Sequence, residues 1–347
     1  MIRIENKIIS NYSPTFIVAE VGANHNGNLE LAKKSIDAAV ECGVDAVKFQ
    51  TYTTEELLSN KKGIVVYGKE GEVSETVQQM FDKVTLKREF HKEIYNYAKN
   101  KGIICFSTPF SNDGVNFLES LNNPIYKIAS SDINYVDMLE EIGKTKKPVI
   151  LSTGKSTIGD LDLAIESLKR NGTEELCLLH CIAIYPPKME DMNLNIIKTL
   201  KQMYPDTIIG FSDHSLGITA ALGAVCLGAK VIEKHFTIDK NLKGPDHWFS
   251  MDPSDMKNLV TEVRNLEAAF GNSRKRVTDS EILDKHWATR SLHINKNLKA
   301  GQIITKEDIS MLRPGYGISP FDKEKVIGMK LTKDINKNEV LEWTHFK

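Results

Sequence analysis

The chain has 347 residues, of which 41% are hydrophobic, so it is long enough to bury one large core and a second, smaller one. Its 45 basic and 46 acidic side chains leave a formal charge of -1, which provides no bulk attraction to nucleic acid or to a membrane surface. The apolar runs have the length of strands, and none approaches the roughly 18 residues of a transmembrane helix.

The first residues and the cysteines both predict a cytoplasmic protein. The opening segment MIRIENKIIS is charged and lacks the apolar stretch and small-residue cleavage site of a signal peptide. The cysteines are odd in number and lie mostly within apolar runs, as reduced thiols in a core do; they are Cys42, Cys105, Cys177, Cys181 and Cys226. A strand would place Cys177 and Cys181 on one face as candidate metal ligands. No second cysteine pair completes a zinc set, however, so packing is the favoured interpretation.

Short apolar runs predict eight strands, at 16–20, 46–50, 102–107, 125–129, 148–152, 176–181, 207–212 and 230–236. Most are almost continuously apolar, as parallel strands covered on both faces are. Amphipathic segments between them predict helices, and the first two end at Gly43 and Gly102, which suit the left-handed position after a helix. Later helices are expected at 135–144, 158–172, 193–203 and 217–229.

This alternation of strands and helices over about 270 residues matches the number and size of a (β/α)8 barrel. An open, doubly wound sheet is the alternative, and it is disfavoured because no glycine-rich dinucleotide turn follows the first strand. The predicted domains are a barrel over 1–271, a charged linker over 272–287 and a small β-rich domain over 288–347. The last of these has short alternating segments separated by Lys, Asn and Gly turns.

Polar side chains follow the apolar part of nearly every predicted strand, and in a (β/α)8 barrel the active site lies at these C-terminal strand ends. Each residue taken singly is more readily a capping or solvent-facing group, but eight coincidences in one register predict an active site. The residues are Glu20; Lys48 and Gln50; Ser107 and Thr108; Lys127, Ser130, Ser131 and Asp132; Ser152 and Thr153; His180 and Tyr185; Ser212, Asp213 and His214; and Glu233, Lys234 and His235.

Two lysines, Lys48 and Lys127, lie in mid-strand, where an unpaired lysine is costly to bury. Together with nearby hydroxyl groups they predict a cradle for an anion that carries both phosphate and carboxylate. Those hydroxyl groups belong to Thr108, Ser130, Ser152 and Ser212. The alternative is that such a lysine pairs with a core glutamate such as Glu20.

Two histidines, His214 and His235, end the neighbouring seventh and eighth strands, so their imidazoles can converge. Two histidines with a carboxylate or a water molecule nearby suit a catalytic divalent ion that keeps open coordination positions. The spacing therefore makes this pair a candidate metal site.

The chain resembles the sialic acid synthase family in motifs that follow one another through the whole predicted barrel: FIVAEVGANHNGN, VKFQTY, STPF, YKIAS, ILSTG, LHC, IYP, GFSDHSLG, GAKVIEKHFT and GPDH. The later RPGYGIS resembles the loop of that family's small antifreeze-like (SAF) domain. The resemblance covers nearly the whole chain. It implies that phosphoenolpyruvate condenses with an N-acylated, mannosamine-type hexose and water, giving a sialic-acid-like nonulosonic acid and phosphate.

The same resemblance assigns roles to residues. It implies a divalent metal, Mn²⁺ or Mg²⁺, that binds His214 and His235 and polarises the sugar aldehyde. Phosphoenolpyruvate would be held by Lys48, Thr108, Lys127, Ser130, Ser152 and Ser212, and the sugar or the water would face Glu20, Gln50, Tyr185 and Asp246. Arg313 of RPGYG would reach the barrel mouth of the neighbouring subunit in a domain-swapped homodimer. Without the resemblance, Arg313 is more readily a surface turn residue.

Two positions depart from the N-acetylneuraminate-forming members. Asp132 in SSD replaces a glutamate, so a carboxylate that can act as acid or base is shorter there. Ala183 replaces an asparagine before IYP and removes a polar group expected near the sugar. An N,N'-diacetyllegionaminic acid synthase that uses a 2,4-diacetamido-trideoxy-mannose is therefore the alternative, while GPDH argues against the pseudaminic branch. Two further alternatives are a metal-dependent sugar aldolase or isomerase, which needs no phosphate cradle, and a carbohydrate- or ice-binding scaffold.

Overall fold

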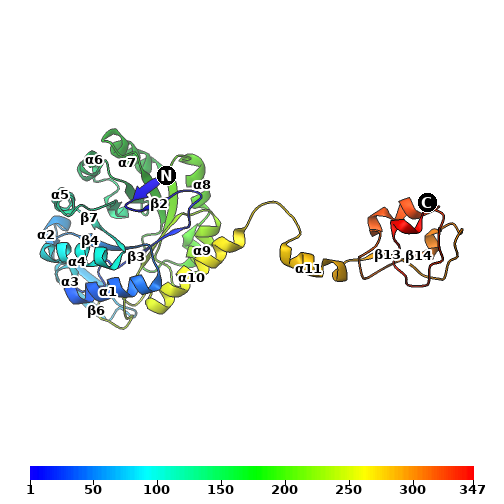
Figure 1. The fold of residues 1–347 in the computed structure, drawn as a ribbon. Helices are drawn as coiled ribbons and strands as arrows, with labels where there is room; N and C mark the ends of the chain where they lie inside the picture. The colour runs from blue at the N-terminus through cyan, green and yellow to red at the C-terminus, as the bar shows by residue number, and fades with distance from the viewer. The chain divides into compact units, whose positions relative to one another are not determined.

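The computed structural model describes residues 1–347 as two compact units, 1–271 and 272–347 (Figure 1). The first unit contains eight parallel strands in the order β7-β4-β3-β12-β11-β10-β9-β8, and β7 and β8 at the two ends of this order contact each other. The sheet is therefore a nearly closed barrel, which confirms the predicted (β/α)8 fold. The strands are β3 Phe16–Glu20, β4 Ala46–Thr51, β7 Ile104–Pro109, β8 Tyr126–Ile128, β9 Val149–Ser152, β10 Leu176–Cys181, β11 Ile208–Asp213 and β12 Val231–His235.

Helices surround the barrel, and most of them lie where the amphipathic segments predict them (Figure 1). α1 and α4 end at Gly43 and Gly102, with φ of 77° and 74°, as the sequence indicates. α5 was not predicted, because it has nine residues and contains a glycine; Ser111 caps its first turn by accepting from the Gly114 N–H. The helices are α1 Leu29–Cys42, α4 Arg88–Lys101, α5 Asn112–Ser120, α6 Val136–Lys144, α7 Ile158–Arg170, α8 Ile196–Met203, α9 Thr219–Cys226 and α10 Pro253–Phe270. None of the helices is both long and apolar enough to span a membrane.

The N-terminal mouth of the barrel is closed by an antiparallel hairpin, β1 Ile2–Ile4 and β2 Lys7–Ile9. Its Ile2, Ile4 and Ile9 are buried against apolar side chains from the first halves of the barrel strands, among them Phe16 and Ile150. This packing fills the lower barrel with apolar side chains. Polar side chains inside the barrel are therefore confined to the opposite mouth.

A glycine inside the barrel, Gly210 on β11, tests this packing. A Cβ atom there would lie 2.5 Å from Leu179 Cδ2 and 2.6 Å from the Val231 carbonyl oxygen, which is backbone and cannot rotate away. Gly210→Ala is therefore expected to destabilise the barrel by about 1–3 kcal/mol, measured by thermal or denaturant unfolding. Gly159→Ala in α7 is the matched control, because its Cβ would meet nothing closer than 3.7 Å. Equal stability of the two variants would contradict the expected crowding at Gly210.

An insertion between β4 and α4, not predicted from the sequence, lies over the C-terminal side of the barrel. It consists of α2 Thr54–Leu57, β5 Ile64–Tyr67, β6 Val73–Thr76 and α3 Val77–Val84, with β5 and β6 paired as an antiparallel hairpin. The hairpin strands have four residues each, and Ile64 and Val66 remain 65% and 64% exposed. Such short, half-exposed strands leave little periodic signal in a sequence.

The second unit has its own apolar core, which includes Leu292, Ile294 and Leu341. β13 Ser291–Ile294 pairs antiparallel with β14 Ile309–Leu312, and the short helix α12 spans Lys323–Val326. The helix α11 Asp279–Ala288 occupies the second half of the range predicted as a linker, 272–287, and ends one residue beyond it. This helix buries none of its side chains, which explains why its sequence shows little periodicity.

Candidate active site

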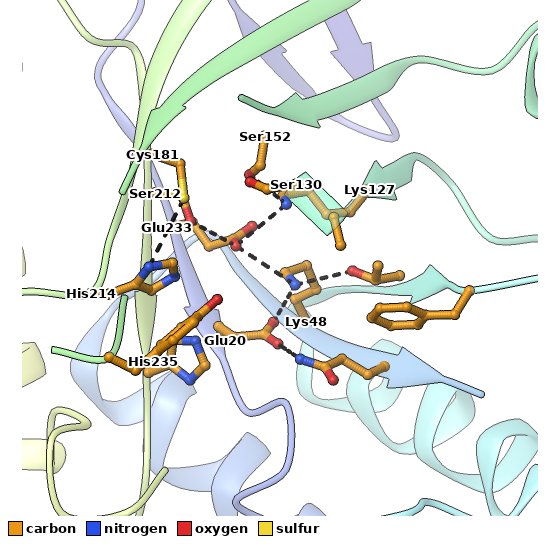
Figure 2. Close-up of a pocket in the computed structure, with 15 residues that line it drawn as sticks. Glu20, Lys48, Lys127, Ser130, Ser152, Cys181, Ser212, His214, Glu233 and His235 are labelled. Atoms are coloured by element: carbon orange, nitrogen blue, oxygen red, sulfur yellow. Dashed lines mark hydrogen bonds and ion pairs between the residues drawn. The ribbon is translucent and has the colours of Figure 1, made fainter. Parts of the chain in front are cut away.

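A small polar cavity lies at the C-terminal mouth of the barrel (Figure 2). The structure brings together in its wall eleven of the predicted site residues: Glu20, Lys48, Gln50, Thr108, Lys127, Ser130, Ser152, Tyr185, Ser212, His214 and His235. Four more residues line the cavity. Phe110 and Ala129 were not predicted, Cys181 was interpreted as a packing residue, and Glu233 was included among the polar strand ends without a specific role. We refer to this as the inner cavity.

Strand alternation explains why these side chains meet. Lys48 follows Ala46 by two residues and precedes Gln50 by two, so all three point to the barrel interior. The register pairs Glu20 with Lys48 on one side and with His235 on the other. Apolar side chains therefore fill the lower part of the interior, and a ring of charged and hydroxyl-bearing side chains forms the upper part.

Two lysines and two glutamates form the centre of this ring (Figure 2). The Lys48 Nζ lies 2.6 Å from the Glu20 Oε2, so the lysine–glutamate pair considered as the alternative is present. Glu233 lies between the lysines, with its Oε1 3.7 Å from both the Lys48 and the Lys127 Nζ. Glu233 is the main residue to which the sequence assigned no role, although it shares the inward face of β12 with His235.

The predicted hydroxyl groups are bonded into the same network. Lys48 donates to the Thr108 Oγ1 at 3.1 Å, and Lys127 donates to the Ser152 Oγ at 2.7 Å. On the other side of the ring, the Ser212 Oγ donates to the Glu233 Oε1 at 3.3 Å. The Ser130 Oγ accepts from the Gly154 N–H at 2.9 Å. The lysines are therefore oriented before any ligand arrives.

The charges of the ring are unevenly balanced. Burial disfavours the charged form of Glu233, but Lys127 and Lys48 outweigh it and hold the pKa of this carboxyl below its usual value. Burial lowers the pKa of Lys127, whereas the pKa of Lys48 is raised because Glu20 and Glu233 outweigh its burial. Burial also raises the pKa of Glu20. Lys127 is thus the cation whose charge is least compensated, and a bound anion would stabilise it.

The histidine pair lies beside this ring, with the His214 and His235 ring centroids 5.3 Å apart. The His214 Nδ1 is 2.9 Å from the Ile182 carbonyl oxygen and must donate to it, which leaves the Nε2 lone pair available. Burial lowers the pKa of His214 to about 4 and that of His235 well below its usual value, so both rings are neutral, as metal ligands must be. The buried His235 Nδ1 has no hydrogen-bond partner.

These observations fit a divalent ion at the histidine pair. No group of three or more His, Cys, Asp and Glu side chains is arranged to hold one. An ion at His214 and His235 would therefore take its remaining ligands from water or substrate oxygens, which is the open arrangement of a catalytic site. Cys177 and Cys181, considered above as ligands, are buried in β10, and the Cys181 Sγ lies 3.9 Å from the His214 Nδ1.

A larger cavity opens above the first one, and we call it the outer cavity. Five residues line both cavities: Gln50, Phe110, Ala129, Tyr185 and His235. The remaining wall is mainly apolar and comes from the insertion and from the loop after β12, including Tyr52, Leu57, Leu58, Val66, Met80, Phe81, Trp248 and Phe249. Asp132 and Asp246 are its only charged lining residues, and no lysine or arginine lines it.

The two acidic residues of the outer cavity are both harder to ionise than a free carboxyl. Burial, with a further contribution from Glu20, raises the pKa of Asp246 to about 7. Its Oδ2 lies 3.4 Å from the His235 Nδ1. Burial also raises the pKa of Asp132, which accepts from the Ser131 Oγ at 2.8 Å. Ala183 is buried and lines neither cavity.

The GPDH loop that carries Asp246 is fastened by a buried histidine, His247. Its Nδ1 lies 2.7 Å from the Thr237 Oγ1, and its Nε2 lies 3.3 Å from the Asn26 Oδ1. The Ser250 Oγ donates to the Asp246 carbonyl oxygen at 2.6 Å. These contacts hold the loop in place and so position Asp246 at the mouth of the barrel.

Buried neutral histidines should make the fold acid-sensitive. Burial lowers the pKa of His247 and His91 to about 4 and that of His25 to about 3. Above pH 6.5 these rings are neutral in both states. As the pH falls below 6.5, only the unfolded chain gains protons, so the free energy of unfolding should fall by roughly 1.4 kcal/mol per pH unit for each histidine. Denaturant unfolding between pH 7 and pH 5 measures this slope.

A single substitution tests that assignment. His91 sits between the Thr51 Oγ1, 2.9 Å from its Nε2, and the Lys87 carbonyl oxygen, 3.1 Å from its Nδ1. His91→Gln can keep a polar contact but cannot titrate, so its pH slope should be shallower than that of the parent chain. An unchanged slope would mean that His91 is not held neutral.

Arg313 lies in the second unit and is exposed. Its loop is held to α11, because the Gly315 N–H donates to the His286 carbonyl oxygen at 2.7 Å and Tyr316 stacks on the His286 ring at 5.4 Å. This anchoring presents Arg313 on a defined turn. Its predicted role in a neighbouring subunit stays a prediction.

Comparisons with known proteins agree on one group. The model described as "NeuB family" matches residues 35–275, and the SAF domain model matches 289–347. The chain is 38% identical to the N,N'-diacetyllegionaminic acid synthase of Legionella pneumophila over 96% of this chain and 94% of that protein. It is also 38% identical to the pseudaminic acid synthase of Campylobacter jejuni serotype O:2 over 96% of both chains. The solved N-acetylneuraminic acid synthetase of Leptospira borgpetersenii, in complex with citrate, is 34% identical, with a TM-score of 0.72 over 82% of this chain and 94% of that one.

Proposed function

The chain belongs to the NeuB family and is a phosphoenolpyruvate-condensing nonulosonate synthase, and we propose that its acceptor is a 2,4-diacetamido-trideoxy hexose. Carbon 3 of the enol attacks the open-chain aldehyde of the sugar, water adds at carbon 2, and phosphate leaves as its C–O bond breaks. The observation that carries this function is the buried ring of lysine, glutamate and hydroxyl side chains next to two neutral histidines.

Phosphoenolpyruvate occupies the inner cavity in this proposal. Lys48 and Lys127 are within hydrogen-bonding distance of the Thr108 and Ser152 hydroxyls, so cations and neutral donors are clustered where phosphate and carboxylate oxygens would sit. Ser130 and Ser212 widen this set of donors. The anion would also stabilise the charged form of Lys127, which burial disfavours.

Synthases of this family depend on a metal ion, and His214 and His235 are the residues that would hold it here. When bound, such an ion acts as a Lewis acid that polarises the aldehyde oxygen of the acceptor. Two carboxyl groups of the chain, those of Glu20 and Asp246, would donate or accept protons near the acceptor. Glu20 is oriented by Lys48 and by the Gln50 Nε2, which donates to its Oε1 at 2.7 Å. Asp246 has a pKa of about 7 and is suited to give or take a proton near neutral pH.

The outer cavity supports the choice of acceptor. Its apolar wall suits the methyl groups of two acetamido substituents and of a deoxygenated sugar end. Within one chain, its wall offers no lysine or arginine to pair with a phosphorylated sugar. The names of the Legionella and Campylobacter relatives favour the same class of acceptor. These relatives include both the legionaminic branch expected from GPDH and the pseudaminic branch, each at 38% identity.

A phosphate-release panel tests both parts of the proposal. The full chain, phosphoenolpyruvate and Mn²⁺ are combined with N-acetylmannosamine, its 6-phosphate, and the diacetamido trideoxy sugars of both configurations, and the acid products are identified by mass. Turnover should be greatest with a diacetamido trideoxy sugar and least with the 6-phosphate. A preference for N-acetylmannosamine would overturn the acceptor assignment. The synthase assignment would fail if no sugar released phosphate.

The second unit is proposed to complete the site of a neighbouring subunit in a domain-swapped homodimer, through Arg313. Arg313→Ala should then lower kcat/KM by about 100-fold through loss of a charge-assisted contact to the acceptor, measured by phosphate release. Arg290→Ala is the control, because Arg290 donates to the Met311 carbonyl oxygen of its own unit. Full activity of Arg313→Ala would show that Arg313 is only a surface turn residue with no role in the site.

A further inference from the structure

Two buried charges lie directly behind the histidine pair. Asp213 precedes His214, and Lys234 precedes His235. Asp213 is fully buried and Lys234 is 2% exposed, and the Lys234 Nζ lies 2.7 Å from the Asp213 Oδ2. The two residues are also register partners on β11 and β12. The ion pair therefore joins the two neighbouring strands immediately before their histidines.

The pair cannot reach the substrate, because successive side chains of a strand point to opposite faces. His214 and His235 line the inner cavity, whereas Asp213 and Lys234 do not. The pair also binds the turn that follows. The Asp213 Oδ1 accepts from the Ser215 N–H at 2.8 Å, and Lys234 donates to the Ser215 carbonyl oxygen. The backbone on both sides of His214 is thus tied to the strand that carries His235.

Stability alone gives little reason for such a pair. Removing two charges from water costs about as much as their attraction returns, and apolar side chains of similar size often serve a fold equally well. A hydrogen-bonded ion pair is directional, and in some proteins such buried polar pairs specify geometry that apolar contacts leave open. We propose that Asp213 and Lys234 are positioning residues that hold the two imidazoles at the separation and angle needed to share one divalent ion. This inference rests on the metal role proposed above for His214 and His235.

The test uses the full chain and the double variant Asp213→Asn/Lys234→Met, which removes both charges and leaves neither unpaired. Mn²⁺ affinity is measured by the electron paramagnetic resonance of free Mn²⁺, and phosphoenolpyruvate affinity is measured separately without metal. The Kd for Mn²⁺ should rise about tenfold or more, as when other supports of metal ligands are removed. The Kd for phosphoenolpyruvate should change much less than that for Mn²⁺, because both of its proposed lysines lie on β4 and β8 and only one proposed donor, Ser212, lies on β11.

Two further variants make the result specific. Lys234→Arg keeps the charge and the contact with Asp213, so it should retain most of the Mn²⁺ affinity. Glu119→Gln/Lys147→Met removes an ion pair of similar length, 2.6 Å, that lies away from both cavities, and it should leave Mn²⁺ binding unchanged. If the double variant fails to fold, Asp213→Asn/Lys234→Leu replaces it, since this pair also leaves no buried charge unpaired and the introduced amide oxygen can still accept from the Ser215 N–H.

The outcomes separate this inference from the proposed function. A folded double variant with parental Mn²⁺ affinity would overturn the positioning role, and so would an equal loss of Mn²⁺ and phosphoenolpyruvate affinity. If the parent chain itself does not bind Mn²⁺, the proposed metal role is wrong. A crystal structure of the double variant then decides the positioning role: rings displaced from their 5.3 Å separation would support it, and unmoved rings would overturn it.

Discussion

Replacing His235 by alanine is expected to lower phosphate release by about 10³-fold or more, while the barrel stays folded. The loss follows from removing one of the two side chains proposed to hold the polarising ion, whose contribution to such a reaction is several kcal/mol. The ring is buried, so truncation also leaves a small cavity next to Phe249. Phosphate release at saturating substrates, together with Mn²⁺ affinity, measures the effect.

A second buried histidine separates chemistry from packing. His180 belongs to β10 but stacks on Phe211 outside the cavity wall, and its Nε2 lies 2.7 Å from the Met192 carbonyl oxygen. His180→Gln should cost stability but keep kcat/KM within about tenfold of the parent chain. Equal losses in His180→Gln and His235→Ala would mean that the His235 effect arises from disturbed packing.

Lys127→Met is expected to raise the KM for phosphoenolpyruvate by about 100-fold, since a buried charged contact is worth about 2–5 kcal/mol to a bound anion. The methionine retains the apolar stem of the lysine, and Glu233 keeps Lys48 as a partner. The site would then hold two carboxylates for one ammonium group, so a multiply charged anion is repelled. Steady-state kinetics with phosphoenolpyruvate as the varied substrate measures this change.

The comparison with a surface lysine makes that result specific. Lys147 pairs with Glu119 at 2.6 Å and lines neither cavity, so Lys147→Met should leave the KM unchanged. A Lys127→Met enzyme with a parental KM would place phosphoenolpyruvate elsewhere. A reduced kcat with an unchanged KM would instead make Lys127 a residue of the chemical step.

The barrel and its ring of polar strand ends were predictable because buried parallel strands appear in a sequence as short apolar runs. Lys48 and Lys127 were identifiable as residues out of place in such runs. Glu233 could have been assigned as well, since strand alternation puts it on the same face as His235. The position of Glu233 between two lysines on other strands could not be predicted, because it depends on the register of the closed sheet.

The outer cavity was harder to foresee for a different reason. Its wall combines the insertion between β4 and α4 with Trp248 and Phe249. The insertion and these two aromatic residues are far apart in the chain. The strands of the insertion are short and half-exposed, so local periodicity gives no sign of them. α11 was not predicted for a similar reason: a helix that buries no side chains lacks the apolar stripe by which a helix is identified in a sequence.

The hairpin that closes the lower barrel has a consequence for the order of events. With β1 and β2 packed into one mouth, the inner cavity opens towards the outer one, with which it shares Tyr185 and His235. If phosphoenolpyruvate binds in the inner cavity and the sugar in the outer one, as proposed above, phosphoenolpyruvate has to enter first, and phosphate has to leave after the new acid. The proposed placement of the two substrates therefore predicts an ordered sequential mechanism, in which the first substrate to bind gives the last product to leave.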